Sequence, residues 1–217
     1  MFSVFLIFQS CSKLDTKVYD QVIYFWKTQD QIAAGVAPAY SGLREFTNPF
    51  VSFVLHEVTT DEIIMPARAG NWYDGGIWEA LWKHTWDANH PQFSGGWQFI
   101  YKGIARINSI LKVLGEMSPS PAEILSIEAE LKTVRAFYYY QAIDLYGNVP
   151  IIEGSETDCA ILGNKKRAEV FAYIEKELKN SIPALTGAVN PKTYGRATKW
   201  LAQTLLAKLY LNAEVFT

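Results

Sequence analysis

The sequence has little cysteine and histidine, and neither sign of charge dominates. Its 217 residues include two cysteines and three histidines, and the formal net charge is −2 from 20 basic and 22 acidic residues. Two cysteines are too few for a disulfide scaffold, and the histidines show no zinc-ligand spacing. There is no basic stripe for nucleic-acid phosphates, no glycine-rich phosphate loop and no nucleophile elbow. The sequence therefore predicts no cofactor and no nucleic-acid partner.

An enzymatic carboxylate pair has little support. Five carboxylates fall within 23 residues, at Glu57, Asp61, Glu62, Asp74 and Glu79. A glycosidase needs two carboxylates held about 5–10 Å apart across the bond that it cleaves. Nothing in the spacing assigns such a pair, so we expect the protein not to be an enzyme.

Aromatic residues are abundant, at 14% of the chain, with seven Trp, twelve Tyr and twelve Phe. Aromatic side chains supply large, rigid contact area, and Tyr and Trp add a polar group. Two interpretations stay open from composition: a large aromatic core, or a surface that stacks on flat apolar ligands such as sugar rings.

The first residues resemble the end of a bacterial lipoprotein signal. The apolar run 4–8 is far shorter than the ~20 residues of a membrane-spanning helix, and Ser10 precedes Cys11. Phe8 stands where Leu is usual, and no basic residue precedes Cys11, which suggests a truncated signal. We expect a signal segment at 1–11, lipidation of Cys11 and a tether at 12–27. The alternatives are an apolar arm with a free thiol and a bridge between Cys11 and Cys159.

Apolar residues at helical spacing predict an all-α fold. Segment 48–61 stays open between a helix and an extended piece, and 66–96 reads as a long loop rich in glycine and tryptophan before a regular pattern starts at Trp97. Ser120, Pro121 and Glu123 form a helix-start signature. The expected helices cover about 28–43, 97–114, 122–145, 168–182, and 198 to the end of the chain.

The last four helices form two successive antiparallel pairs, which resemble tetratricopeptide-type repeats. Such pairs stack to bury a shared core. The final helix keeps an apolar face with no following neighbour, so we expect one domain, 28–217, that is part of a longer chain. The alternative is an atypical capping helix.

Several segments together resemble the SusD/RagB family. They are 135–142 (RAFYYYQA), 145–150 (LYGNVP), 196–203 (RATKWLAQ), 207–211 (AKLYL), 60–62 (TDE) and 71–76 (NWYDGG). The resemblance implies a lipoprotein on the outer face of the outer membrane that binds oligosaccharide. It further implies delivery of that ligand to a SusC-type TonB-dependent transporter. A helical-repeat scaffold that binds a protein partner without carbohydrate affinity is the alternative.

Most of the residues in these motifs have a structural interpretation. Arg135 lies on a helix whose other face is core, so we expect it to pair with an acidic side chain or to cap carbonyls of a neighbouring helix. Gly147 is expected to end that helix in the left-handed conformation, and Pro150 to continue as an extended exit.

The best candidate for a ligand site is in the tryptophan-rich loop. Arg68, Asn71, Trp72, Tyr73 and Asp74 supply a stacking surface, an amide, a cation and a carboxylate within seven residues, a combination that sugar-binding proteins commonly use. The alternative is that Trp72 and Tyr73 pack the loop onto the helices. In contrast, Trp78, Trp82 and Trp86 recur every four residues, a helical stripe that is more typical of core.

The lipoprotein hypothesis makes a direct prediction. Mass spectrometry of the mature protein should find Cys11 carrying acyl chains, because lipidation anchors a protein that has no spanning helix. An unmodified Cys11 in the mature protein contradicts it.

Overall fold

The computed structural model describes residues 28–48, 51–116, 122–154 and 162–217. The signal segment 1–11 with Cys11, the tether 12–27, Cys159, Ser120 and Pro121 lie outside these residues, so the predictions made for them stay predictions. Within the described part of the chain there is no strand, only two isolated bridges. The predicted all-α fold is therefore confirmed.

Helices account for most of the described chain. No helix in these residues combines the length and the apolar character that crossing a membrane requires. Short 3₁₀ turns η1 (Leu43–Thr47), η2 (Asp74–Gly76) and η3 (Ile182–Ala184) supplement the α-helices. The α-helices are α2 (Gln29–Gly42), α3 (Ser52–Glu57), α4 (Ile77–Trp82), α5 (Pro91–Gly115), α6 (Ala122–Tyr146), α8 (Arg167–Ser181), α9 (Lys199–Leu211) and α10 (Ala213–Phe216).

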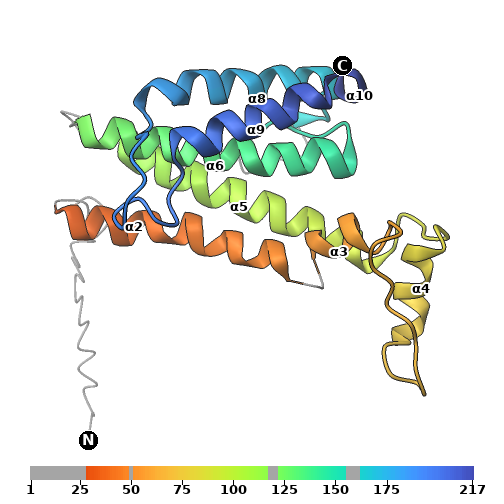
Figure 1. The fold of residues 1–217 in the computed structure, drawn as a ribbon. Coiled ribbons are helices and arrows are strands. Elements are labelled where there is room, and N and C mark those ends of the chain that lie inside the picture. Colours follow the sequence, from red (N-terminus) through yellow and green to blue (C-terminus); the bar gives the residue numbers. More distant parts are fainter. Residues whose placement is uncertain (1–27, 49–50, 117–121, 155–161) are drawn as a thin grey trace, which may run out of the picture.

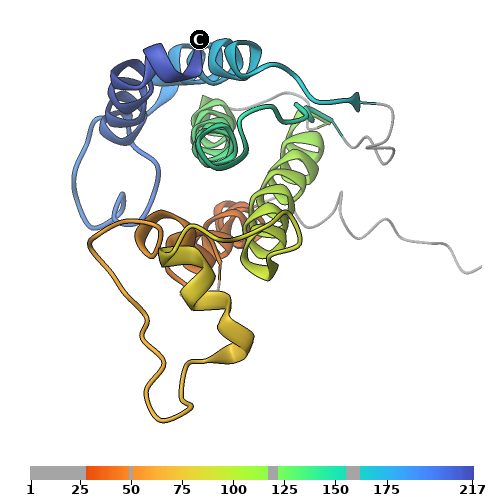
Figure 2. The same cartoon turned by 90° about the vertical axis from the view of Figure 1, so that its right-hand side faces the viewer.

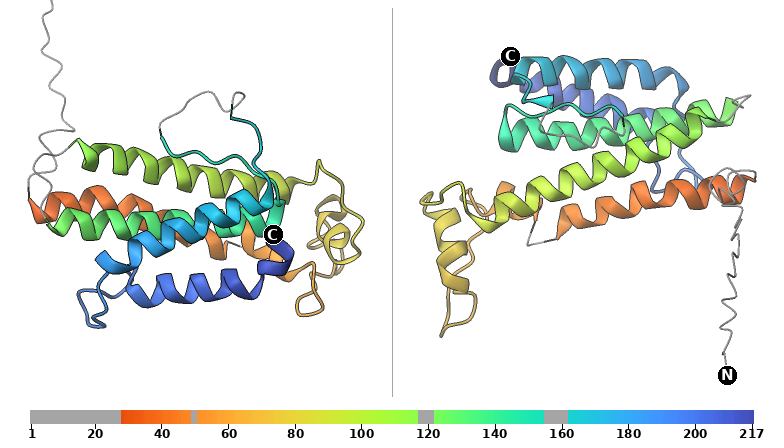
Figure 3. Two further views of the ribbon diagram at one scale, coloured as in Figure 1. Left: turned by 90° about the horizontal axis from the view of Figure 1, so that it is seen from above. Right: turned by 180° about the vertical axis from the view of Figure 1, so that it is seen from behind.

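The long helices stack in layers. α6 lies between α5 and α8, α2 covers the other side of α5, and α9 lies beside α8 (Figure 1). The view from behind shows the same order, with α4 at one end of the stack (Figure 3). This stacking of neighbouring helices agrees with the predicted repeat-like packing.

Helix α5 begins six residues before the predicted start at Trp97, so that boundary was wrong. His90 caps it by accepting the Gln92 amide at Nδ1, and Pro91 occupies the first turn. Gly96, which looked like a loop residue, lies inside the helix. A Cβ at this position would lie 2.6 Å from the Tyr146 hydroxyl, which accounts for the glycine. The glycine permits a close approach of helices rather than a turn.

Gly103 on α5 faces the ring of Tyr138 on α6. A Cβ on Gly103 would lie 2.2–2.6 Å from three atoms of the Tyr138 ring, so only glycine fits at this position. Tyr138 and Tyr139 are fully buried in the main core. The Tyr139 hydroxyl accepts the Ile152 amide at 2.7 Å and donates to the Ile152 carbonyl at 3.1 Å. Burial raises the pKa of Tyr139 to about 12.

Arg135 pairs with an acidic side chain, as predicted. Its Nη2 and Nε donate to Glu177 Oε2 on α8 at 2.6 and 3.0 Å, and Nη1 donates to Asn108 Oδ1 on α5 at 2.7 Å. Burial lowers the pKa of Arg135 and the Glu177 carboxylate raises it, with a net upward direction. One guanidinium thus joins three helices through charge-assisted hydrogen bonds.

The LYGNVP segment ends α6 and starts the return to α8. Gly147 has φ of 72°, which confirms its predicted helix-ending role. Asn148 Oδ1 accepts the amide of Arg167 at the start of α8, at 2.9 Å. The Pro150 carbonyl accepts the Tyr101 hydroxyl at 2.9 Å, which ties this exit to α5.

The RAT segment fastens the α8–α9 loop to the opposite side of the stack. Arg196 makes two bonds to Glu130 on α6, Nη2 to Oε1 at 2.8 Å and Nε to Oε2 at 3.1 Å. Tyr40 on α2 donates to the same carboxylate at 2.6 Å and accepts the Ala197 amide at 3.1 Å. Arg196 and Ala197 therefore hold this loop against α6 and α2, a role that the sequence analysis did not assign to them.

The Gly103–Tyr138 contact predicts a selective loss of stability. Gly103→Ala should lower the free energy of unfolding by about 1–3 kcal/mol, because the added methyl overpacks the α5–α6 contact. Gly115→Ala on the same helix meets no atom within 4 Å and should be neutral or stabilising by up to about 1 kcal/mol. Guanidinium unfolding midpoints measure both, and equal effects contradict the packing assignment.

Candidate functional site

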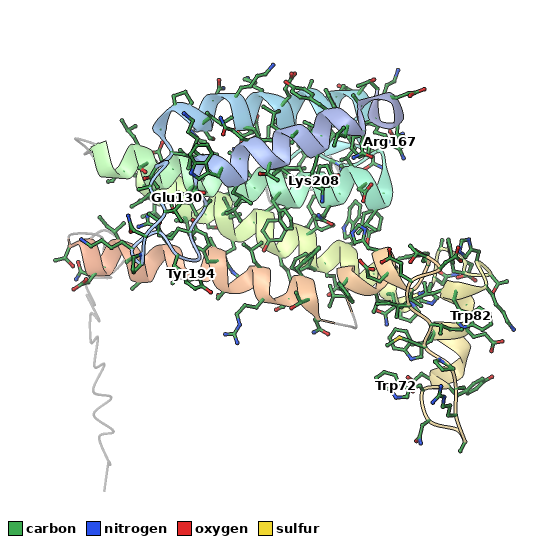
Figure 4. All side chains as sticks on the ribbon, viewed as in Figure 1. Trp72, Trp82, Glu130, Arg167, Tyr194 and Lys208 are labelled. Carbon is green, nitrogen blue, oxygen red and sulfur yellow. The ribbon has the colours of Figure 1, made fainter. Side chains whose placement is uncertain are left out.

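Residues 58–90, between α3 and α5, form a separate lobe at one end of the helix stack. Figure 2 shows η2, α4 and the preceding loop projecting away from the long helices. In the side-chain view, Trp72 and Trp82 both lie on this lobe, whereas Glu130 and Tyr194 lie toward the other end of the molecule (Figure 4). The tryptophan-rich segment is thus a projection that contains a helix, α4.

The lobe packs against α3 in a second, smaller core, which we call the lobe cluster. Trp78 and Leu81 on α4 are 1% and 0% exposed. Trp82 and Trp86 are half-buried against the same cluster, so the stripe packs largely as predicted, although α4 ends at Trp82 and Trp86 lies beyond it. The buried members of the cluster are Val54, Leu55, Val58, Trp78 and Leu81.

Arg68 and Asn71 form a tight turn at the lobe surface. Each backbone amide donates to the carbonyl of the other residue, at 3.1 and 3.0 Å. Both residues are exposed, so their side chains are accessible to a ligand. The turn places Trp72 and Tyr73 directly after its second arm, where their side chains are 49% and 55% exposed.

The backbone around these aromatics is strained. Ala69, Trp72 and Asp74 have φ of 49°, 63° and 43°, in the left-handed region that side chains with a Cβ disfavour. Gly70, Gly75 and Gly76 are also left-handed, which glycine tolerates without cost. Strained non-glycine residues gather at ligand sites more often than elsewhere, because function justifies a conformation that costs stability.

Trp72 and Tyr73 line a cleft of about 270 Å³ on the lobe. A cleft of this size is just below the roughly 300–1,000 Å³ typical of pockets that enclose a drug-sized ligand. The cleft therefore has room for one ring of a ligand, and the other rings of a longer ligand would lie outside it. The other described residues lining it are Met65, Pro66, Ala67, Glu79 and Trp82.

Glu79 and Trp82 are cleft residues that the sequence did not assign to the site. They lie three residues apart on α4, and hence on one face of that helix. That i, i+3 spacing is the signal that would have found them. Glu79 forms an ion pair with Lys83, whose ammonium lies 5.2 Å from the centre of the Trp82 ring.

Asp74 is an exposed residue whose carboxylate is bonded to a buried tryptophan. Its Oδ2 accepts the Trp78 indole N–H at 2.7 Å, and the rings of Trp78 and Trp72 meet edge to face at 6.1 Å. Asp74 is not among the cleft-lining residues, so of the five predicted site residues only Trp72 and Tyr73 line the cleft. The carboxylate therefore positions Trp78, which supports Trp72.

No group of three or more His, Cys, Asp or Glu side chains suited to a metal ion occurs in the described ranges. What the lobe offers is an aromatic cleft with one carboxylate in its lining and an exposed polar turn beside it. Aromatic faces with a few polar groups around them suit a ligand with flat apolar surfaces and hydroxyl edges.

The sequence of the chain matches one known protein family over most of its length. Residues 14–211 match the SusD-like family described as starch-binding and associating with the outer membrane. The chain belongs to the SusD-like family. The starch-binding protein SusD of Bacteroides thetaiotaomicron is 30% identical over 168 residues, which are 76% of this chain and 28% of that protein. A SusD-like protein of Bacteroides ovatus is 28% identical over 140 residues, 57% of this chain and 25% of that protein.

Solved SusD-like structures share the fold. A laminarin-binding SusD-like protein superimposes with a TM-score of 0.75 at 24% identity, over 87% of this chain and 41% of that one. A SusD-like protein from Bacteroides fragilis gives 0.73 at 20% identity, over 88% and 36%. The chain spans between about a quarter and two fifths of the length of the SusD-like proteins named here.

The Asp74–Trp78 bond predicts that Asp74 stabilises the lobe. Asp74→Ala should lower the free energy of unfolding by about 1–2 kcal/mol, because it removes the indole acceptor and places alanine in left-handed backbone. Asp74→Asn keeps an acceptor oxygen and tolerates that backbone, so it should cost less than about 1 kcal/mol.

Arg68→Ala is the matched control for this prediction. Arg68 is exposed on the same lobe, so its loss should stay within about 0.5 kcal/mol. Urea unfolding followed by tryptophan fluorescence measures all three variants. An Asp74→Ala protein as stable as Arg68→Ala contradicts the assignment.

Proposed function

We propose that this protein binds oligosaccharide at the lobe and delivers it to a SusC-type TonB-dependent transporter. The proposed ligand contacts are Trp72 and Tyr73 in the cleft, with Arg68 and Asn71 at its exposed edge, while Asp74 acts through Trp78. The observation that carries the proposal is the pair of half-exposed aromatic side chains lining a cleft on a strained, ordered projection.

Family membership supports the ligand class and the location. The family is described as starch-binding and associating with the outer membrane, and one similar structure is of a laminarin-binding protein. We propose the same general role here, with attachment through a lipid on Cys11 at the cell exterior. Delivery to a transporter extends the family resemblance to a partner.

We propose that the protein binds glycan without cleaving it. Two of the five candidate carboxylates are engaged by neighbours: Asp74 accepts the Trp78 indole and Glu79 is paired with Lys83. Only Glu79 of the five lines the cleft, and a hydrolytic site needs two carboxyl groups across the bond.

A protein-binding scaffold without carbohydrate affinity is the second candidate. Its support is the apolar surface at both ends of α9, where Trp200 and Leu211 are 52% and 84% exposed. Exposed apolar side chains are typical of contact surfaces between proteins or domains. Direct measurement of glycan binding separates the two candidates.

Trp72→Ala tests the proposed function. Affinity electrophoresis of the full chain through gels containing starch or laminarin should show retardation that Trp72→Ala weakens at least about tenfold, because aromatic side chains that the ligand covers dominate such contacts. Trp72→Phe should restore much of the binding, since it keeps an aromatic face.

Trp200→Ala is the matched control, because Trp200 is a similarly exposed tryptophan on α9 that lies outside the lobe. Its binding should equal that of the unaltered protein. Equal retardation of the Trp72→Ala and unaltered proteins would show that the glycan does not bind at the lobe. An absence of glycan binding in the unaltered protein would favour the scaffold.

A further inference from the structure

His84 follows α4 in a backbone conformation that residues with a side chain disfavour. Its φ is 56°, in the left-handed region, and its amide donates to the Leu81 carbonyl at 3.2 Å, as the residue just after a helix commonly does. Glycine usually fills such a position, because a Cβ is strained there. Histidine at this position costs stability, so we expect its side chain to supply a contact that glycine could not.

The His84 side chain joins the end of α4 to the segment that follows α3. Its Nε2 donates to the Thr59 carbonyl at 2.9 Å, since a carbonyl oxygen can only accept. The imidazole also lies against Trp86, with the two ring centres 5.0 Å apart. Thr59 is itself bonded to α3, because its hydroxyl donates to the Leu55 carbonyl at 2.8 Å. The chain after α4 is thus held to a point that α3 fixes.

This bond lies at the base of the two walls of the cleft. One wall is α4, whose Trp82 lines the cleft two residues before His84. The other wall is the segment 60–67, which we call the arm. The arm starts directly after Thr59, and its residues 65–67 line the cleft. A bond between His84 and Thr59 therefore fixes the spacing of the walls where they begin to diverge.

The other end of α4 has a bond of the same kind. Asp74, which precedes α4, also has left-handed backbone, with φ of 43°. Its carboxylate accepts the Trp78 indole N–H at 2.7 Å, and Trp78 contacts Trp72. Strained residues thus flank α4 on both sides, and each makes a side-chain hydrogen bond that holds part of the cleft.

We propose that His84 is a positioning residue, which holds α4 at the distance from the arm that accepts a sugar ring. The proposal rests on the proposed function, because it concerns the same cleft. His84 is not among the described residues that line the cleft, so it acts through Trp82 and Glu79, which are. A binding site keeps its affinity only when its side chains stay within about 0.5 Å of the productive geometry, and such precision comes from supporting bonds of this kind.

Two variants of the full chain separate positioning from support of the fold. His84→Gly removes the bond and relieves the left-handed backbone. It should keep or raise the guanidinium midpoint while weakening retardation by laminarin or starch roughly threefold to tenfold, as expected for one lost hydrogen bond. His84→Gln places an amide N–H near the position of Nε2 and keeps the strained backbone. It should retain affinity within about twofold without raising the midpoint.

His56→Ala is the matched control. His56 on α3 makes a bond of similar length away from the cleft, with 2.8 Å between its Nε2 and Gln141 Oε1 on α6. Its loss should lower the guanidinium midpoint and leave retardation by the glucan unchanged. Trp72→Ala, measured in the same gels, shows whether the glycan binds in the cleft.

The outcomes distinguish the inference from the proposed function. Retardation that Trp72→Ala weakens and His84→Gly leaves unchanged overturns the inference and leaves the proposed function intact. Equal weakening by His84→Gly and His56→Ala, or by His84→Gly and His84→Gln, also overturns it, because the effect then does not follow the bond to Thr59. Absence of retardation in the unaltered protein, or retardation that Trp72→Ala leaves unchanged, overturns the proposed function and the inference together.

Discussion

The structure depends on one helix that serves two hydrophobic cores. α5 is 25 residues long, about 37 Å at 1.5 Å per residue, and runs from the lobe into the stack (Figure 3). Phe93 near its start packs on the lobe cluster, while Leu114 near its end is buried in the main core. The Tyr146 hydroxyl on α6 donates to the Phe93 carbonyl at 2.7 Å, so α6 holds the same junction. The lobe is therefore fixed to the stack by packing on the first turn of α5, which the Tyr146 bond holds against α6, and not by chain connectivity alone.

This anchoring holds the aromatic rings of the cleft in place before a ligand binds. A stacking surface binds well when its rings are ordered before the ligand arrives, because little conformational entropy is then lost. Trp72 contacts Trp78, Trp78 is held by Asp74 and buried in the lobe cluster, and that cluster rests on the first turns of α5. The strained backbone at Trp72 is sustained by the same supports. The strained backbone of the lobe lowers the stability of the fold. In the stack, the hydrogen bonds of Arg135 and Glu130 join helices and stabilise it.

The fold and the motif roles were largely predictable, whereas the cleft was only partly so. Helical spacing found the long helices, and the buried position of Arg135 required the acidic partner that Glu177 supplies. The start of α5 was missed because Gly95 and Gly96 signal a loop locally, while the reason for Gly96 is a contact with Tyr146 that sequence order does not reveal. Trp72 and Tyr73 were found through their aromatic chemistry. Glu79 was missed as a lining residue, because the direction of a side chain depends on tertiary packing. The ligand role predicted for Asp74 stays a prediction.

The central claim is that the lobe's tryptophans, and not those of the helix stack, meet the glycan. Indole N–H resonances of the full chain labelled with ¹⁵N-tryptophan test it most directly, because each resonance reports on one ring. On titration with a neutral gluco-oligosaccharide, the account predicts that the Trp72 and Trp82 resonances shift with a common saturation curve while those of Trp97 and Trp200 stay unchanged. Shifts confined to Trp200, or none at the lobe when binding is saturated, would contradict it.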